Sequence, residues 1–153
     1  MDSYTYSHSD ADLAGQPIGY WSWAAHKAVV TSIRAALAEY GLTQPRWWVL
    51  GQLGLADDGR TRDELYDTLH GYLDVGEALH GEIDALAAAG LIAADDGRFR
   101  LTAGGETVRA KAAVSVRGVL DRVHRNVTDE EYVTTLKVLQ RMIQNVDGEA
   151  WHH

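Results

Sequence analysis

Apolar residues recur along much of the chain at the three- and four-residue spacing of an amphipathic helix. The first such helix is predicted over residues 19–40. Its apolar positions are Trp23, Val30, Ile33, Leu37 and Tyr40. Gly41 then suits the position that ends a helix. Residues 1–18 are rich in Ser, Asp, Tyr and Gly, so we expect them to form a polar arm.

Three shorter helices are predicted next, each preceded by a residue that suits a helix N-terminus. Thr43 is expected to cap a helix that runs to about Leu55. Thr61 and Glu64 have the spacing of a capping box before the third helix. Asp74 is expected to cap the fourth. The predicted buried stripes of these helices are Trp48, Leu50 and Leu53, then Leu65, Leu69 and Leu73, then Leu79, Ile83 and Leu86.

The segment 93–102 predicts two short strands joined at Asp96-Gly97, a dipeptide that favours hairpin turns. A long helix is then predicted from about Ala103 to Arg125. A second capping-box pattern at Thr128–Glu131 opens the last helix. That helix carries a near-heptad stripe of Tyr132, Leu136, Leu139 and Ile143.

This order of elements predicts a mainly α fold with a small β-hairpin. Three short helices followed by a hairpin are typical of a winged helix-turn-helix. The predicted parts are an arm (1–18), a dimerisation helix (19–40), the winged helix-turn-helix (41–102) and C-terminal dimerisation helices (103–153). A central block of about 60 residues cannot cover the apolar stripes of the flanking helices. We therefore expect a two-fold homodimer in which they pair with a second copy.

The composition of the chain limits the kinds of chemical site that it can form. The 153 residues include no Cys, which excludes disulfides, thiolate metal sites and Cys nucleophiles. His70 and His80 belong to different predicted helices, so no metal site is expected. Gly104-Gly105 follows the hairpin rather than a phosphate-binding turn, so no cofactor is expected either. No apolar run approaches 18 residues and no signal-peptide pattern is present, so the expected location is the cytoplasm, without a membrane partner.

Several segments, in this order, resemble the MarR family of winged-helix transcriptional regulators. They are Gly41-Leu42-Thr43 through Leu50–Leu53, Ile83–Leu86 through Gly90-Leu91-Ile92, Leu101–Gly105, and Thr128–Tyr132 through Leu139 and Asn145. The resemblance covers roughly residues 19–145. It implies an obligate homodimer, paired recognition helices over a pseudo-palindromic operator, and a small aromatic or phenolic ligand between the DNA-binding and dimerisation parts.

The charge of the predicted DNA-binding block departs from that family pattern. Residues 43–102 hold five Arg, no Lys and eleven acids, a net charge of −6, within a chain of net charge −8. DNA affinity depends largely on cations that displace counterions from phosphates. Double-stranded DNA is therefore an electrostatically disfavoured partner. The residues available to contact it are His80 on the predicted recognition helix and Arg98 and Arg100 on a shortened wing.

The chain holds five Trp, and flat aromatic side chains suit an aromatic ligand. In the architecture that the resemblance implies, the start of the first predicted helix and the early part of the second border the ligand cleft. The predicted ligand-binding residues are Trp23, His26, Arg46, Trp47, Trp48 and His70. Trp47 and Trp48 project about 100° apart on a helix, so at most one lies deep in the core.

Three functions remain open at this point. The first is a MarR-like homodimeric regulator that responds to a small aromatic ligand. The second is a descendant of that fold that has lost operator binding and binds or transforms a small molecule in its aromatic cleft. The third is an acidic module that binds a basic protein. No catalytic set can be assembled from the sequence, and an enzyme is the less favoured outcome.

Overall fold

The computed structural model describes residues 3–150. The first two residues of the predicted arm and residues 151–153 of the predicted C-terminal part lie outside this range, including His152 and His153. The chain forms two compact units, Met1–Ser32 and Ile33–His153. No helix of the described residues is long and apolar enough to cross a membrane.

The N-terminal unit contains a short helix that the sequence pattern did not predict. α1 (Asp10–Leu13) is capped by Ser9, whose hydroxyl accepts a hydrogen bond from the Asp12 amide. α2 (Ile18–Ala38) starts in this unit, within one residue of the predicted start, and ends in the second unit. The predicted helix over residues 19–40 is thus confirmed, with its end two residues early.

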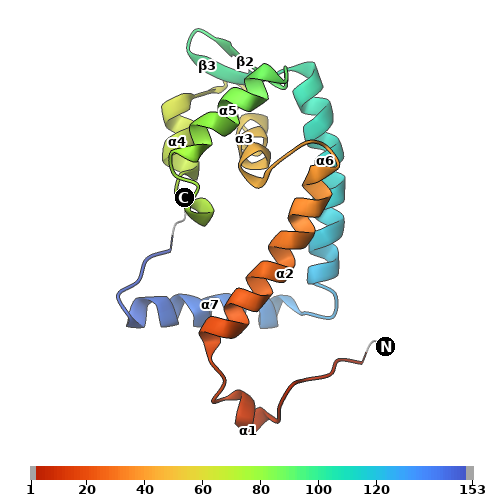
Figure 1. Ribbon diagram of the computed structural model, residues 1–153, viewed down its shortest axis with the longest axis vertical. Coiled ribbons are helices and arrows are strands. Elements are labelled where there is room, and N and C mark those ends of the chain that lie inside the picture. The colour runs from red at the N-terminus through yellow and green to blue at the C-terminus, as the bar shows by residue number, and fades with distance from the viewer. Residues whose placement is uncertain (1–2, 151–153) are drawn as a thin grey trace. The chain divides into compact units, whose positions relative to one another are not determined.

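The second unit is a winged helix-turn-helix followed by two further helices (Figure 1). Its helices are α3 (Gln44–Gly54), α4 (Arg62–Leu69), a 3₁₀ turn η1 (Tyr72–Asp74), α5 (Ala78–Ala88), α6 (Ala103–Val123) and α7 (Asp129–Asn145). Its strands are β1 (Arg60–Thr61), β2 (Ile92–Asp95) and β3 (Arg98–Leu101). Figure 1 shows α3, α4, α5 and the β2–β3 hairpin gathered at one end of α6, with α7 at the other.

The wing is a three-stranded antiparallel sheet in the order β1-β3-β2. The hairpin forms as predicted: Ile92 pairs with Leu101 and Asp95 with Arg98. Asp96 and Gly97 turn the chain with φ of 52° and 73°, the left-handed pair that a two-residue hairpin needs. The added strand, β1, pairs Arg60 with Phe99 and joins the start of α4 to the wing.

The core of the second unit gathers apolar residues from α2 to α6. The largest fully buried side chains are Leu37, Leu50, Leu65, Leu69, Leu79, Ile83, Leu86, Ile92 and Val49. All but Ile92 and Val49 lie on the stripes that the periodicity predicted. Each fully buried Leu or Ile contributes roughly 1.5–3 kcal/mol. This packing fixes α5 against α3 and α4.

The connection between α4 and α5 corrects two expectations. Leu73, predicted to be buried, is 49% exposed, because α4 ends at Leu69. Asp74, predicted to cap the next helix, has a φ of 54°, and α5 starts after Glu77 without a side-chain cap. Leu73 also has a left-handed φ of 46°. Two consecutive left-handed residues break the helical path that the leucine spacing suggested.

Candidate functional site

A cavity of about 420 Å³ lies in the second unit, beside the turn that precedes α5. Its lining comes from the end of α2, the α2–α3 loop, α3, η1 and α5. The lining residues are Arg34, Leu42, Thr43, Gln44, Pro45, Trp48, Leu73, Val75, Ala78 and Glu82. Cavities of roughly 300–1,000 Å³ with mainly apolar walls and a few fixed polar groups are typical of small-molecule sites.

One polar group of the cavity is an arginine held in place by a buried amide. Arg34 donates from Nε to Oε1 of Gln44 over 3.0 Å. Gln44 is only 7% exposed, because it begins α3 against the core. The bond uses one of the five N–H donors of the guanidinium. The others leave Arg34 able to bind an anion.

The second polar group is the carboxylate of Glu82 on α5. Its Oε2 accepts a hydrogen bond from the hydroxyl of Thr43 and lies 3.0 Å from Nε of Arg46. Thr43 is also the cap of α3, accepting from the Arg46 amide over 3.3 Å. The start of α3 and the middle of α5 are therefore tied together at the edge of the cavity.

The predicted ligand residues have different surroundings. Trp48 lines the cavity and packs against Tyr72, with ring centroids 5.6 Å apart. Trp47 packs against the core, and the guanidinium of Arg46 is taken up by Glu82. His70 stacks on Tyr66 at 4.8 Å between centroids.

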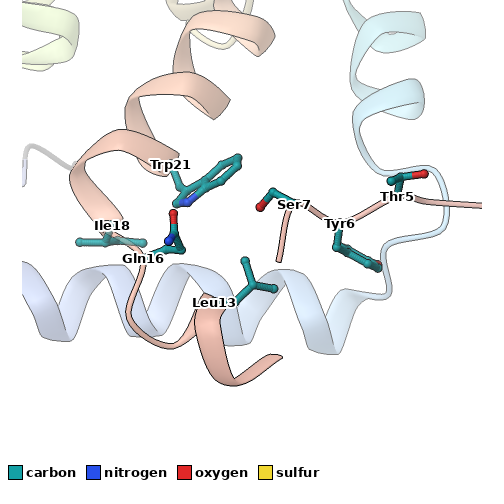
Figure 2. A pocket seen from close by; sticks show the side chains of 7 residues that line it. All are labelled: Thr5, Tyr6, Ser7, Leu13, Gln16, Ile18 and Trp21. Carbon is teal, nitrogen blue, oxygen red and sulfur yellow. The ribbon is translucent and has the colours of Figure 1, made fainter. Parts of the chain in front are cut away.

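The two remaining candidates, Trp23 and His26, belong to the N-terminal unit. Trp23 is exposed and packs against Tyr20 and the ammonium of Lys27. That unit has its own pocket of about 560 Å³, which neither candidate lines. Figure 2 shows the seven residues around it, with Trp21 opposite Leu13 and Tyr6.

Arg34, Gln44 and Glu82 were not among the residues predicted to bind a ligand. Arg34 and Gln44 meet across a loop, and Glu82 meets Thr43 across 39 positions. Periodicity does not report contacts of this kind. A sequence signal that pointed toward this site was Thr43 as an N-cap, because it places Gln44 in the first turn of α3.

The wing arginines are held by the loop before β1. Arg98 donates from Nε to the Asp58 carbonyl over 2.9 Å and from Nη2 to the Gly59 carbonyl over 3.1 Å. Arg100 donates to the same Asp58 carbonyl over 3.2 Å and pairs with Asp95 at 3.5 Å. Gly59 is required at this contact, because a Cβ there would lie 2.4 Å from the Phe99 carbonyl oxygen.

On the exposed side of α5, the charge of an arginine is also balanced by an acidic side chain. Arg62 pairs with Asp84 at 2.6 Å and donates to the His80 carbonyl over 3.3 Å. Four of the five arginines in residues 43–102 form ion pairs, namely Arg46, Arg62, Arg98 and Arg100. The acidic partner of an arginine in an ion pair offsets the positive charge that attracts a phosphate, so such an arginine binds DNA more weakly than an unpaired one.

His80, the predicted base-reading residue, is also engaged. Tyr66 lies between the rings of His70 and His80, at 4.8 and 5.1 Å between centroids. The carboxylate of Glu77 accepts from the Tyr66 hydroxyl at 2.9 Å and lies 3.3 Å from Nε2 of His80. The hydrogen bond to Glu77 raises the pKa of Tyr66 above its ordinary value. Within residues 3–150, no cluster of three or more His, Asp or Glu could hold a metal ion.

The fold and the positions of α5 and the wing define the class: a winged helix-turn-helix with flanking helices. A MarR family transcriptional regulator from Silicibacter pomeroyi is 21% identical, with a TM-score of 0.68 over 91% of this chain and 99% of its own. The transcriptional repressor CouR is 22% identical, with a TM-score of 0.70 over 90% and 98%. A Mycobacterium tuberculosis MarR family protein, solved in complex with DNA, is 25% identical, with a TM-score of 0.63 over 83% and 98%.

No family model and no curated protein matches the sequence. The likeness therefore lies in the structure. The chain has the MarR-like winged-helix fold, as its sequence pattern indicated.

Proposed function

We propose that this protein is a ligand-responsive regulator of the MarR-like type and that a small aromatic molecule binds in the cavity of the second unit. The observation that carries the proposal is the lining of that cavity. Leu73 and Val75 come from the turn before α5, and Ala78 and Glu82 from α5 itself. A ligand held there contacts the helix that, in this fold, faces DNA.

The turn before α5 supports a regulatory use of that contact. Leu73 and Asp74 adopt left-handed backbone conformations, which cost a non-glycine residue on the order of 1–3 kcal/mol each. A ligand that packs against Leu73 changes the balance between this turn and a relaxed one. It thereby shifts the position of α5, provided that it binds the two arrangements unequally.

We further propose that the protein acts as a homodimer. Large apolar side chains are exposed on α6, on α7 and between them, including Leu120, Val127, Tyr132, Val133 and Leu136. A soluble monomer rarely exposes so many together. Replacing Leu136 with Glu is expected to convert a dimer to a monomer in sedimentation velocity, whereas Lys137→Glu, one position along α7, is the matched surface control. A wild-type monomer would remove this part of the proposal.

A second function is favoured by the ion pairs of Arg62, Arg98 and Arg100. A protein in which these three arginines have acidic partners is suited to binding a small molecule without an operator. In this alternative the cavity still binds a small molecule, and the winged-helix face no longer binds an operator.

One experiment separates the two functions. Binding of a duplex from the region upstream of the protein's own gene is measured by fluorescence anisotropy, with and without salicylate. Salicylate is a suitable first probe, because a Mycobacterium tuberculosis MarR family protein of similar fold, 24% identical, was solved in complex with salicylic acid. Calorimetry with salicylate alone is run in parallel.

A regulator binds the duplex and changes its affinity when salicylate is added. A protein of the second kind binds salicylate in calorimetry and leaves the duplex free at 50 mM salt. If salicylate and other simple aromatic acids all fail to bind in calorimetry, the cavity is not the ligand site and both functions are contradicted.

A further inference from the structure

The two charged side chains of the cavity, Arg34 and Glu82, differ in the partner that each still lacks. Arg34 is fixed through Nε by Gln44, and its terminal nitrogens have no partner among residues 3–150. A guanidinium in this state is suited to a carboxylate, which it binds through two parallel hydrogen bonds. It provides the anchor for an acid.

Glu82 is left with a single unused acceptor. Both of its partners, the Thr43 hydroxyl and Nε of Arg46, approach Oε2. Oε1 has no partner within the described part of the chain, and the side chain is only 23% exposed. An ionised carboxylate oxygen accepts hydrogen bonds and cannot donate them. A ligand group beside it must therefore donate.

The charges around the cavity determine whether that donor is cationic or neutral. Arg46 already neutralises Glu82 at 3.0 Å, so Arg34 is the unbalanced charge of the cavity. A singly negative ligand balances it, and a second, cationic group is not required. The donor is therefore expected to be neutral.

From these three observations we propose that the cavity selects aromatic acids that carry a neutral amino group on the ring. Arg34 takes the carboxylate, Trp48 provides the flat wall, and Oε1 of Glu82 accepts from the amino group. Glu82 is thus the specificity-determining residue of the site. This proposal rests on the ligand-binding function proposed above.

The test compares ligands of nearly equal shape. Calorimetry measures the Kd of 3- and 4-aminobenzoate and of 3- and 4-methylbenzoate, in which a methyl group replaces the amino group. The methyl group displaces water from Oε1 of Glu82 without replacing its hydrogen bond, so at one ring position at least the aminobenzoate is expected to bind about tenfold or more tightly.

Three variants test which residue causes the preference for the aminobenzoate. Glu82→Leu is expected to remove or reverse the preference for the aminobenzoate. Arg46→Met breaks the same ion pair but keeps the carboxylate, and it is expected to preserve the preference. Arg34→Met is expected to weaken aminobenzoate and methylbenzoate alike. A thermal melt of each variant confirms that it is folded.

Equal Kd values for amino- and methylbenzoates at both ring positions would overturn the selectivity while leaving the cavity an aromatic-acid site. A preference that survives in Glu82→Leu would overturn the role of Glu82. If none of the four acids binds the wild-type protein, both this proposal and the ligand-binding function fail.

Discussion

The ion pairs of the winged-helix face predict that DNA binding is limited by arginines that have other partners. Asp84 holds Arg62 at 2.6 Å, and Asp95 holds Arg100 at 3.5 Å. The double variant Asp84→Ala/Asp95→Ala removes both acidic partners. Each arginine then keeps its bond to a backbone carbonyl, a neutral acceptor that forms weaker bonds than a phosphate does, and Arg62 also keeps its place over the Phe99 ring.

The size of the effect follows from counterion release. Two freed arginines per protomer are four in the proposed dimer, so the slope of log K against log salt becomes steeper by roughly 0.9 for each, about 3.6 in all. Between 200 and 50 mM salt, this added slope corresponds to roughly a 100-fold extra gain in affinity. The assay is fluorescence anisotropy of a duplex of about 30 base pairs over that salt range.

The control is Asp63→Ala/Asp67→Ala on α4, which removes the same charge from acids that pair with no Lys or Arg in the described residues. It is expected to change the slope by far less, because it frees no cation. If the two double variants have the same salt slope, net charge alone governs DNA affinity. The argument from individual ion pairs is then wrong.

Two further predictions concern the fold. Gly105→Ala is expected to prevent stable folding, because its Cβ would lie 1.9 Å from the Leu91 carbonyl oxygen. In Gly118→Ala, a variant of the same helix, the added Cβ meets nothing within 4 Å, and the free energy of unfolding is expected to rise by about 0.5–1 kcal/mol. Chemical denaturation measures both. The amide and hydroxyl of Thr128 lower the pKa of Glu131 from 4.5, so its contribution to stability is present above pH 4.5 and is lost as pH falls through the lowered pKa. The protection of the amides at the start of α7 against hydrogen exchange, relative to their intrinsic rates, is expected to fall over that range in the wild type and not in Glu131→Gln; identical acid profiles would contradict this.

Much of the fold could be predicted because local signals and burial agree. Thr61 and Glu64 form the capping box that their spacing indicated, with bonds of 3.1 and 3.2 Å. Leu79, Ile83 and Leu86 are all buried, as the four- and three-residue spacing required. In these segments the same spacing of apolar residues predicts both the helix and the side that it buries.

The connection between α4 and α5 could not be predicted in the same way. Leu73 continues the spacing of Leu65 and Leu69, yet the chain leaves the helix before it and turns through Leu73 and Asp74 in left-handed conformations. The cavity depends on this turn, because Leu73 and Val75 line it. A pattern of apolar residues reports which residues prefer burial, and it does not report where the backbone stops to form a site.

α5 provides the physical connection between the cavity and the exposed face. Glu82 and Asp84 are two positions apart, so their side chains project about 200° apart around the helix. Glu82 faces the cavity and Asp84 pairs with Arg62 on the exposed side, while Ile83 between them is fully buried. Because Ile83 anchors the helix in the core, a ligand that displaces the backbone at Glu82 moves α5 as a unit and so disturbs the Arg62–Asp84 pair. In the proposed regulator, cavity occupancy and the availability of Arg62 are therefore coupled through one helix. The Asp84→Ala/Asp95→Ala variant should lose the part of any ligand effect on DNA affinity that depends on breaking the Arg62 pair.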